Sequence, residues 1–197
     1  MSKKVEFLFD FASPTAYLAY TQLPRIAEQQ GAEIIWTPIL LGGVHKACGN
    51  QSPVLVPAKG RWMFGDIAKW AKRYGVAFET NPNFPVNTIA LMRGAVGVQM
   101  RMPDQFPAYV EALYKAMWVT PRNLGEPSEV AAALNAAGLD AQKIFALVGE
   151  QDVKDKLKAN SDDAVARGVF GAPTFFVHDE MFFGQDRLDF VAEALAA

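Results

Sequence analysis

A serine at the start of a predicted helix is the first residue whose type and position suggest chemistry. Ser13 and Pro14 follow residues 5–11, an apolar segment dense in β-forming side chains. Serine is a favoured helix N-cap and proline is favoured at the first helical position, so a helix is predicted to begin there. A hydroxyl at that place lies at the positive end of the helix dipole, which stabilises anions. The same serine can equally be a cap with no other role.

Other reactive side chains are few and scattered. Cys48 is the only cysteine, so an intramolecular disulfide is excluded. It lies near Asn50 in the sequence and could be close to the reactive site, but a lone small hydrophobe is the favoured interpretation. His45 and His178 are isolated and show no metal-ligand spacing, so no metal site is expected.

The composition describes one compact globular unit. The chain has 197 residues, of which 51% are hydrophobic, so it can bury a substantial core. A net charge of −2 gives no electrostatic case for a nucleic-acid or membrane partner. We find no secretory signal and no apolar run near the ~20 residues of a membrane span. With a single cysteine, a cytoplasmic location is expected.

The elements that position Ser13 form a predicted βαβ unit. A strand over residues 5–11 leads into a helix that begins at Ser13 and ends at Gly31, and residues 32–37 form a second strand. Two strands joined in this way are expected to be parallel, with a right-handed crossover. From Gly42 onward, glycines and prolines predict an irregular loop.

Helical patterns fill the next hundred residues, and the β pattern then returns. Apolar spacings of three and four predict helices that contain Met63 to Tyr74 and Phe106 to Met117. Further helices are predicted over residues 88–100, 126–137, 140–148 and 152–167. Residues 174–177 and 181–183 are predicted to form a hairpin, followed by a helix that Asp186 caps. The predicted architecture is α/β: a βαβ…ββα fold of residues 1–42 and 160–197, interrupted by an all-helical insertion of residues 43–159.

This order, together with Ala172-Pro173-Thr174 before the third strand, resembles the thioredoxin superfamily in its DsbA-like form. The resemblance implies a thioredoxin-like fold and a cis peptide bond at Pro173, facing the first helix. A cis-proline loop leaves the backbone groups of the preceding residue free to pair with an extended peptide. The redox members carry Cys-x-x-Cys where residues 13–16 read Ser-Pro-Thr-Ala. Dithiol–disulfide exchange by that mechanism is therefore excluded.

A narrower resemblance is to kappa-class glutathione transferases and 2-hydroxychromene-2-carboxylate isomerases. It rests on residues 9–14 (Phe-Asp-Phe-Ala-Ser-Pro), 49–53 (Gly-Asn-Gln-Ser-Pro), 57–60 (Pro-Ala-Lys-Gly) and 183–188 (Phe-Gly-Gln-Asp-Arg-Leu). The resemblance implies that Ser13 faces the sulfur of glutathione and is the catalytic residue. The other glutathione-binding residues it implies are Pro14, Thr15, Asn50, Lys59, Ala172, Pro173, Gln185 and Asp186.

The second-substrate pocket is less defined by the sequence. Dedicated isomerases of this kind place a basic residue after the second strand to bind the substrate carboxylate. Lys46 is the candidate here, in a segment that reads Leu-Gly-Gly-Val-His-Lys over residues 41–46. Residues 84–88, with Asn87, and Trp118 are predicted to line the pocket, although these aromatic side chains could equally belong to the core.

The resemblance implies an enzyme that opens 2-hydroxychromene-2-carboxylate and isomerises it to trans-o-hydroxybenzylidenepyruvate through glutathione addition and elimination. A kappa-like transferase or peroxidase, which consumes glutathione, is the first alternative. A non-catalytic module that binds a peptide or thiol is the second. The expected partners are glutathione and a small aromatic or conjugated organic acid, and the family resemblance implies a homodimer.

Overall fold

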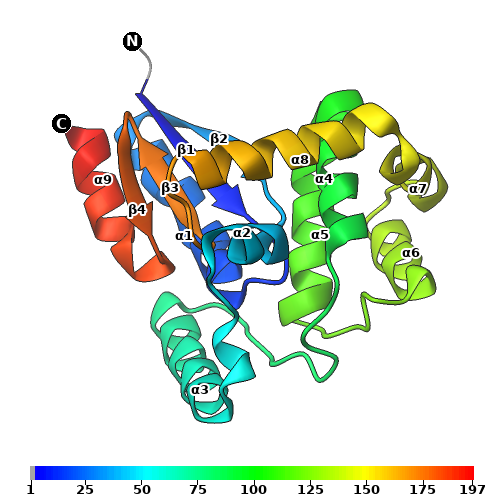
Figure 1. The fold of residues 1–197 in the computed structure, drawn as a ribbon, viewed down its shortest axis with the longest axis horizontal. Coiled ribbons are helices and arrows are strands. Elements are labelled where there is room, and N and C mark those ends of the chain that lie inside the picture. Colours follow the sequence, from blue (N-terminus) through cyan, green and yellow to red (C-terminus); the bar gives the residue numbers. More distant parts are fainter. Residues whose placement is uncertain (1–2) are drawn as a thin grey trace.

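The computed structural model describes residues 3–197 as a four-stranded mixed sheet with helices on both of its faces (Figure 1). The strand order is β2-β1-β3-β4. β1 (Lys3–Phe9) and β2 (Ala32–Pro38) are parallel, as predicted, and β3 (Thr174–Val177) is antiparallel to β1. β4 (Glu180–Phe183) completes the predicted antiparallel hairpin.

β1 ends two residues earlier than predicted. The Ser13 amide donates to the Asp10 carbonyl at 3.0 Å, so the chain turns directly after Phe9. Phe11 therefore leaves the strand, although its ring stays buried in the core. This turn delivers Ser13 to the start of α1 (Pro14–Gln30), which ends at Gly31 as predicted.

Two helices cover each face of the sheet. α1 and α9 (Leu188–Ala196) pack on the face that carries Val5 and Phe7, in one hydrophobic cluster with Val191. α8 (Gln151–Ala166) and α2 (Leu41–Cys48) pack on the opposite face, where Leu8 belongs to a second cluster. The period-two alternation of buried side chains along β1 accounts for both clusters.

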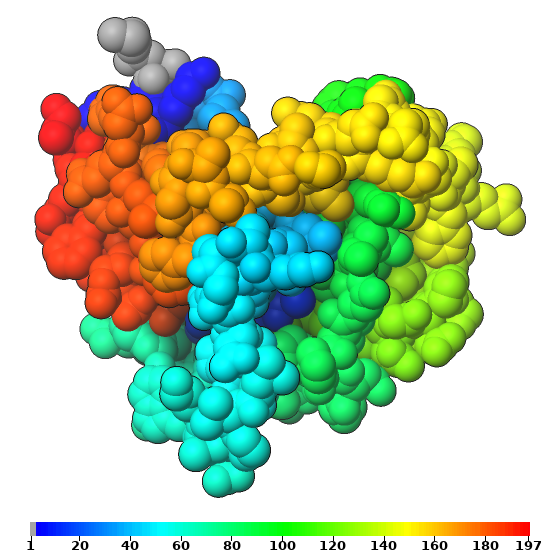
Figure 2. Space-filling model, in the orientation of Figure 1, coloured from blue at the N-terminus to red at the C-terminus, as the bar shows by residue number. Residues whose placement is uncertain are grey.

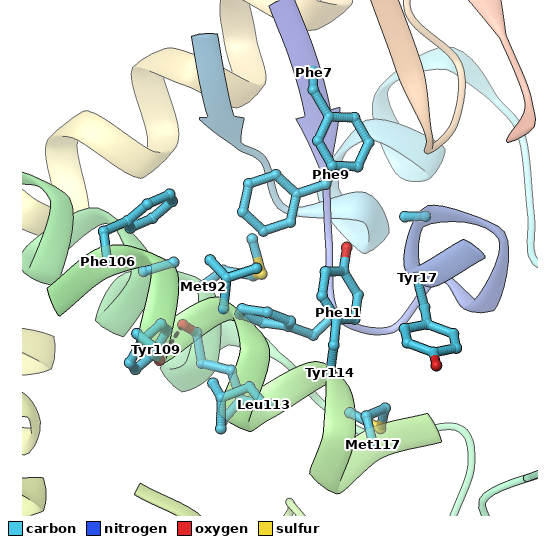
Figure 3. Packing of buried hydrophobic residues seen from close by; sticks show 14 of the residues in the cluster. Phe7, Phe9, Phe11, Tyr17, Met92, Phe106, Tyr109, Leu113, Tyr114 and Met117 are labelled. Carbon is cyan, nitrogen blue, oxygen red and sulfur yellow. Dashed lines mark hydrogen bonds between the residues drawn. The ribbon is translucent and has the colours of Figure 1, made fainter. Parts of the chain in front are cut away.

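The helical part of the chain lies between β2 and β3 in the sequence. It contains α3 (Pro57–Tyr74), α4 (Ile89–Arg101), α5 (Phe106–Trp118), α6 (Pro127–Ala136) and α7 (Ala141–Gly149). α4 and α5 come close together at Gly94, where a Cβ would collide with Tyr109. The Tyr109 hydroxyl donates to the Leu91 carbonyl at 2.7 Å (Figure 3). No helix over residues 3–197 has the length and apolarity of a membrane span.

The helical part and the sheet share one core. Phe7, Phe9 and Phe11 form a row of aromatic contacts that continues to Tyr114 of α5, with the Phe11 and Tyr114 centroids 5.0 Å apart (Figure 3). The boundary predicted between residues 159 and 160 falls inside α8, which is continuous. The division into two units stays a prediction about topology, since the packing shows no break at that point.

Two predictions about local structure were wrong. Residues 41–48 form α2 instead of an irregular loop, because the Asp10 carboxylate accepts from the Leu41 amide at 2.8 Å and Val44 is buried. Asp186 does not cap the last helix: it lies in a 3-10 turn, Gln185–Arg187, and α9 begins after Arg187. Its carboxylate instead pairs with the Arg187 guanidinium at 2.9 Å.

Candidate active site

Ser13 has the geometry of a helix N-cap. Its backbone is extended (φ −91°, ψ 111°), and its Oγ accepts from the Ala16 amide at 3.0 Å. Pro14 occupies the first helical position, as its fixed φ favours. The side chain is almost fully buried, with 4% exposed. The positive end of a seventeen-residue helix, next to a hydroxyl that is almost completely shielded from solvent, is a favourable place for an anion.

The predicted cis-proline loop faces this hydroxyl. The Ala172–Pro173 peptide bond is cis, as predicted, and Phe84–Pro85 is also cis, which was not predicted. The Ser13 hydroxyl donates to the Ala172 carbonyl at 2.8 Å, across 159 residues of sequence. The Ala172 amide donates to no atom within residues 3–197. The loop therefore offers a backbone donor beside the helix start.

A cavity of about 690 Å³ opens over Ser13. Figure 2 shows the hollow between the cyan and green segments, with part of the dark-blue N-terminal segment at its bottom. This volume is typical of small-molecule sites. The structure brings together six of the predicted site residues in its lining: Ser13, Pro14, Thr15, Asn50, Asn87 and Ala172.

Asn50 lies at the rim of the cavity and links two loops. Its Nδ2 donates to the Phe170 carbonyl at 2.8 Å, and its Oδ1 accepts from the Gln51 amide at 2.8 Å. Phe170 lies two residues before Ala172, and its ring packs at a tilt against Phe183 with centroids 4.5 Å apart. Asn50 thus joins the segment after α2 to the loop that carries Ala172.

The predicted C-terminal contacts lie outside the cavity lining. Gln185 is buried, and its Oε1 accepts from the Tyr74 hydroxyl at 2.6 Å, which ties α3 to the start of α9. Asp186 is half-exposed beside Arg187. Burial, followed by the charges of Asp186 and Asp189, raises the pKa of Tyr74 to about 12, so this phenol stays protonated and donates.

Both predicted lysines are exposed and neither lines the cavity. Lys59 stands in the first turn of α3, and Lys46 is on α2. Trp118 does not line the cavity, which favours the alternative that its side chain belongs to the core. Its side chain is completely buried, its Nε1 donates to the Phe11 carbonyl at 2.9 Å, and its ring packs on Phe84. It supports the cavity wall through Phe84 and does not reach the cavity itself.

A buried carboxylate at the cavity floor was not predicted as a site residue from the sequence. Asp10 is completely buried, and its two oxygens accept from the Ala12 amide at 2.9 Å and the Leu41 amide at 2.8 Å. Burial raises the pKa of the Asp10 carboxyl, although hydrogen bonds from these amides and the Thr88 side chain oppose the rise. An acidic residue three positions before a helix cap, between apolar neighbours, was the signal that could have revealed it.

His45 is a second lining residue that sequence reasoning left without a role. It lies on α2 and is half-buried. Burial lowers the pKa of its imidazole, so the neutral ring dominates near pH 7. It therefore adds a polar group to the cavity without adding a positive charge.

Comparisons with known proteins agree with the thioredoxin-like fold. Residues 4–196 match a family model described as a DSBA-like thioredoxin domain. A 2-hydroxychromene-2-carboxylate isomerase from Sphingobium xenophagum is 33% identical over 99% of both chains. A glutathione S-transferase kappa 1 from Rattus norvegicus is 27% identical over 97% of this chain and 90% of its own length.

Solved structures of other proteins share this fold. A 2-hydroxychromene-2-carboxylate isomerase structure superposes with a TM-score of 0.84 at 28% identity, and covers 98% of this chain and 94% of its own. A probable DsbA oxidoreductase from Streptomyces coelicolor superposes with a TM-score of 0.79 at 19% identity, over 98% of this chain and 88% of its own. The second likeness concerns the fold alone.

Proposed function

We propose that this chain, which belongs to the DSBA-like thioredoxin family in the group of 2-hydroxychromene-2-carboxylate isomerases and kappa-class glutathione transferases, is a glutathione-dependent isomerase. One observation carries the proposal. The buried Ser13 hydroxyl stands at the N-terminus of α1, beside the cis-proline loop, and opens on a cavity. No cysteine occupies this place, so a reacting sulfur must come with the ligand.

The energetics of the site are adequate for thiolate formation. A free thiol titrates near pH ~8.5, and lowering that pKa by about two units needs roughly 2.7 kcal/mol in favour of the anion. A helix N-terminus contributes ~0.3–1 kcal/mol, and up to ~2 where it is partly buried. A hydroxyl that donates to an anion contributes about 1.5–3 kcal/mol. Ser13 and α1 together therefore suffice without a cationic base.

The remaining contacts would hold the tripeptide along the rim of the cavity. The Ala172 amide would donate to the backbone of glutathione, next to Pro173. Asn50 and Lys59 would bind the polar groups toward the glycyl end. Gln185 and Asp186 would bind the γ-glutamyl end, Gln185 through its backbone amide, because both its carbonyl and its side-chain oxygen already accept from the Tyr74 hydroxyl.

The chemistry is reversible addition. The thiolate attacks the β-carbon of a conjugated carbonyl compound, an S–C bond forms, and the π electrons move to the carbonyl oxygen as an enolate. The former double bond is then single and rotates. The electron pair returns, the S–C bond breaks and the thiolate is released, so glutathione is regenerated. On 2-hydroxychromene-2-carboxylate, the hemiketal would open first: the ring C–O bond breaks, the hydroxyl proton passes to the phenol oxygen, and a ketone conjugated with the cis double bond is formed. Addition, rotation and elimination would then give trans-o-hydroxybenzylidenepyruvate.

A transferase is the second candidate, favoured by the similarity to kappa-class enzymes. It shares the first step. Protonation of the enolate carbon would then trap the adduct, and glutathione would be consumed. The binding site for glutathione and the role of Ser13 would be the same in both cases.

Turnover with limiting glutathione tests the proposal. The enzyme is incubated with excess 2-hydroxychromene-2-carboxylate and a small amount of glutathione, and the trans product is measured. Trans product in large excess over the glutathione added supports the isomerase, whereas a glutathione adduct that accumulates in proportion to the glutathione consumed identifies a transferase. No glutathione-dependent reaction and no glutathione binding would contradict both. The homodimer and the cytoplasmic location stay predictions, and sedimentation of the purified chain tests the first.

A further inference from the structure

The part of the cavity wall that glutathione would leave free contains no positively charged side chain among the described residues. Among residues 3–197, no lysine or arginine lines it. Apolar side chains make up most of the wall that glutathione would leave free: Leu41, Met63, Phe84, Pro85, Val86 and Ile89. Transfer of a carboxylate to such a wall without a partner is costly.

The two titratable groups in the lining do not compensate for this. Asp10 is acidic, so it cannot bind a carboxylate as an ion pair. His45 is half-buried, and burial lowers the pKa of its imidazole, which leaves the ring neutral near pH 7.

The N-termini of α2 and α4 are the other positive features of this wall, and side chains of the protein occupy both. In α4 the Ile89 amide donates to Asn87 Oδ1 at 3.0 Å. The N-terminus of α2 is occupied by an acid. The Leu41 amide, in the first turn of α2, donates to the Asp10 carboxylate at 2.8 Å. A carboxylate at a helix N-terminus neutralises the field that would otherwise attract a substrate anion. Lys46 stands on the same helix, but it is exposed and outside the lining.

We infer that the second substrate of this chain is an uncharged conjugated ketone or aldehyde, in preference to a conjugated carboxylate. This inference rests on the proposed function and narrows its substrate class. The apolar wall receives the hydrophobic body of the acceptor, and Ser13 directs the glutathione sulfur to its β-carbon. The bonds formed and broken are those of the addition and elimination above.

A matched pair of acceptors tests the inference. Benzylideneacetone and benzylidenepyruvate carry the same styryl enone, and the second has a carboxylate in place of a methyl group. For each we would measure the glutathione-dependent kcat/KM, divided by the rate of its uncatalysed reaction with glutathione. We expect the neutral acceptor to be favoured by about tenfold or more, since each factor of ten corresponds to ~1.4 kcal/mol.

A lysine introduced into the cavity wall tests whether the absence of a positive charge causes the preference for the neutral acceptor. A Cβ added at Gly42, which lines the cavity, meets no atom within 4 Å, so Gly42→Lys should be accommodated. Gly42→Met is the uncharged control of similar length. The lysine should reduce the preference for the neutral acceptor about tenfold, and the methionine should leave it in place.

The outcomes separate the two proposals. An equal or larger normalised kcat/KM for benzylidenepyruvate in the unmodified enzyme overturns the inference, and so does a preference that Gly42→Lys leaves unchanged. If glutathione forms no thiolate on the enzyme and neither acceptor reacts, the proposed function itself fails, and the substrate preference fails with it.

Discussion

The single proton of the Ser13 hydroxyl is directed at the Ala172 carbonyl in this structure. To stabilise a thiolate, the hydroxyl must turn toward the sulfur and leave that carbonyl without its donor. The Thr15 hydroxyl is close enough to replace Ser13 as the donor to the Ala172 carbonyl. Its Oγ1 lies 3.0 Å from Ser13 Oγ and 3.4 Å from the Ala172 carbonyl oxygen. We therefore predict that Thr15 is a positioning residue that frees the Ser13 proton.

Thr15→Val keeps the shape of the side chain and removes its hydroxyl. We expect kcat to fall about 2- to 10-fold, in line with the ~0.5–1.5 kcal/mol of one hydrogen bond. The KM for glutathione should change little, because the lost bond acts on the thiolate. Thr15→Ser restores the hydroxyl and should restore kcat. A Thr15→Val enzyme with unchanged kcat and an unchanged pH profile would contradict this role.

At the scale of elements, Asp10 connects three segments that surround the cavity. It follows β1, caps the first turn of α2 through the Leu41 amide, and contacts Thr88 at the start of α4. Its oxygens satisfy two backbone amides that would otherwise be buried without acceptors. Asp10 therefore holds the floor of the site in place, although it is not assigned to the chemistry.

Asp10→Asn places an amide group against at least one of these backbone donors. An unpaired buried donor costs about 1–3 kcal/mol, so the free energy of unfolding should decrease by that amount. Urea denaturation followed by circular dichroism measures the change. Asp104→Asn, an exposed carboxylate in a short turn, is the control and should stay within about 0.5 kcal/mol of the parent. Equal stabilities of Asp10→Asn and the parent would show that the two amides find other acceptors.

Local patterns predicted the elements better than they predicted the long-range contacts. The N-cap at Ser13 and the αL residue at Gly31 depend on neighbouring residues, so the bounds of α1 could be predicted. α2 could not, since Gly42 and Gly43 have low helix propensity and the helix is stabilised by Asp10, 31 residues away from Leu41. The sequence left open whether Trp118 lines the pocket or belongs to the core, because an aromatic residue at helical spacing does not reveal which of two buried surfaces it contacts.

At the scale of the whole molecule, glutathione would bridge the N-terminal segment, the cis-proline loop and the start of α9. A ligand that binds only the folded state stabilises all of it, by about 2.7 kcal/mol at a concentration of 100 times Kd. The aromatic core that joins β1 to α5 would transmit this stabilisation to the helical part as well.

Asp186→Ala should reduce the rise in Tm that glutathione produces, because the proposed γ-glutamyl contact is lost. The Tm without glutathione should change little, since the carboxylate is half-exposed and pairs only with neighbouring Arg187. Asp189→Ala, an exposed carboxylate three residues further on, is the matched control for charge. Identical glutathione-induced shifts in both variants and the parent would remove Asp186 from the binding site.

The pKa of enzyme-bound glutathione, followed through the ultraviolet absorbance of its thiolate, tests the central claim most directly. In the unmodified enzyme we expect this pKa to lie about two units below the ~8.5 of a free thiol. In Ser13→Ala it should return most of the way toward that value, while glutathione still binds. A bound thiol whose pKa is the same in both proteins would contradict the assignment of Ser13 as the residue that stabilises the thiolate.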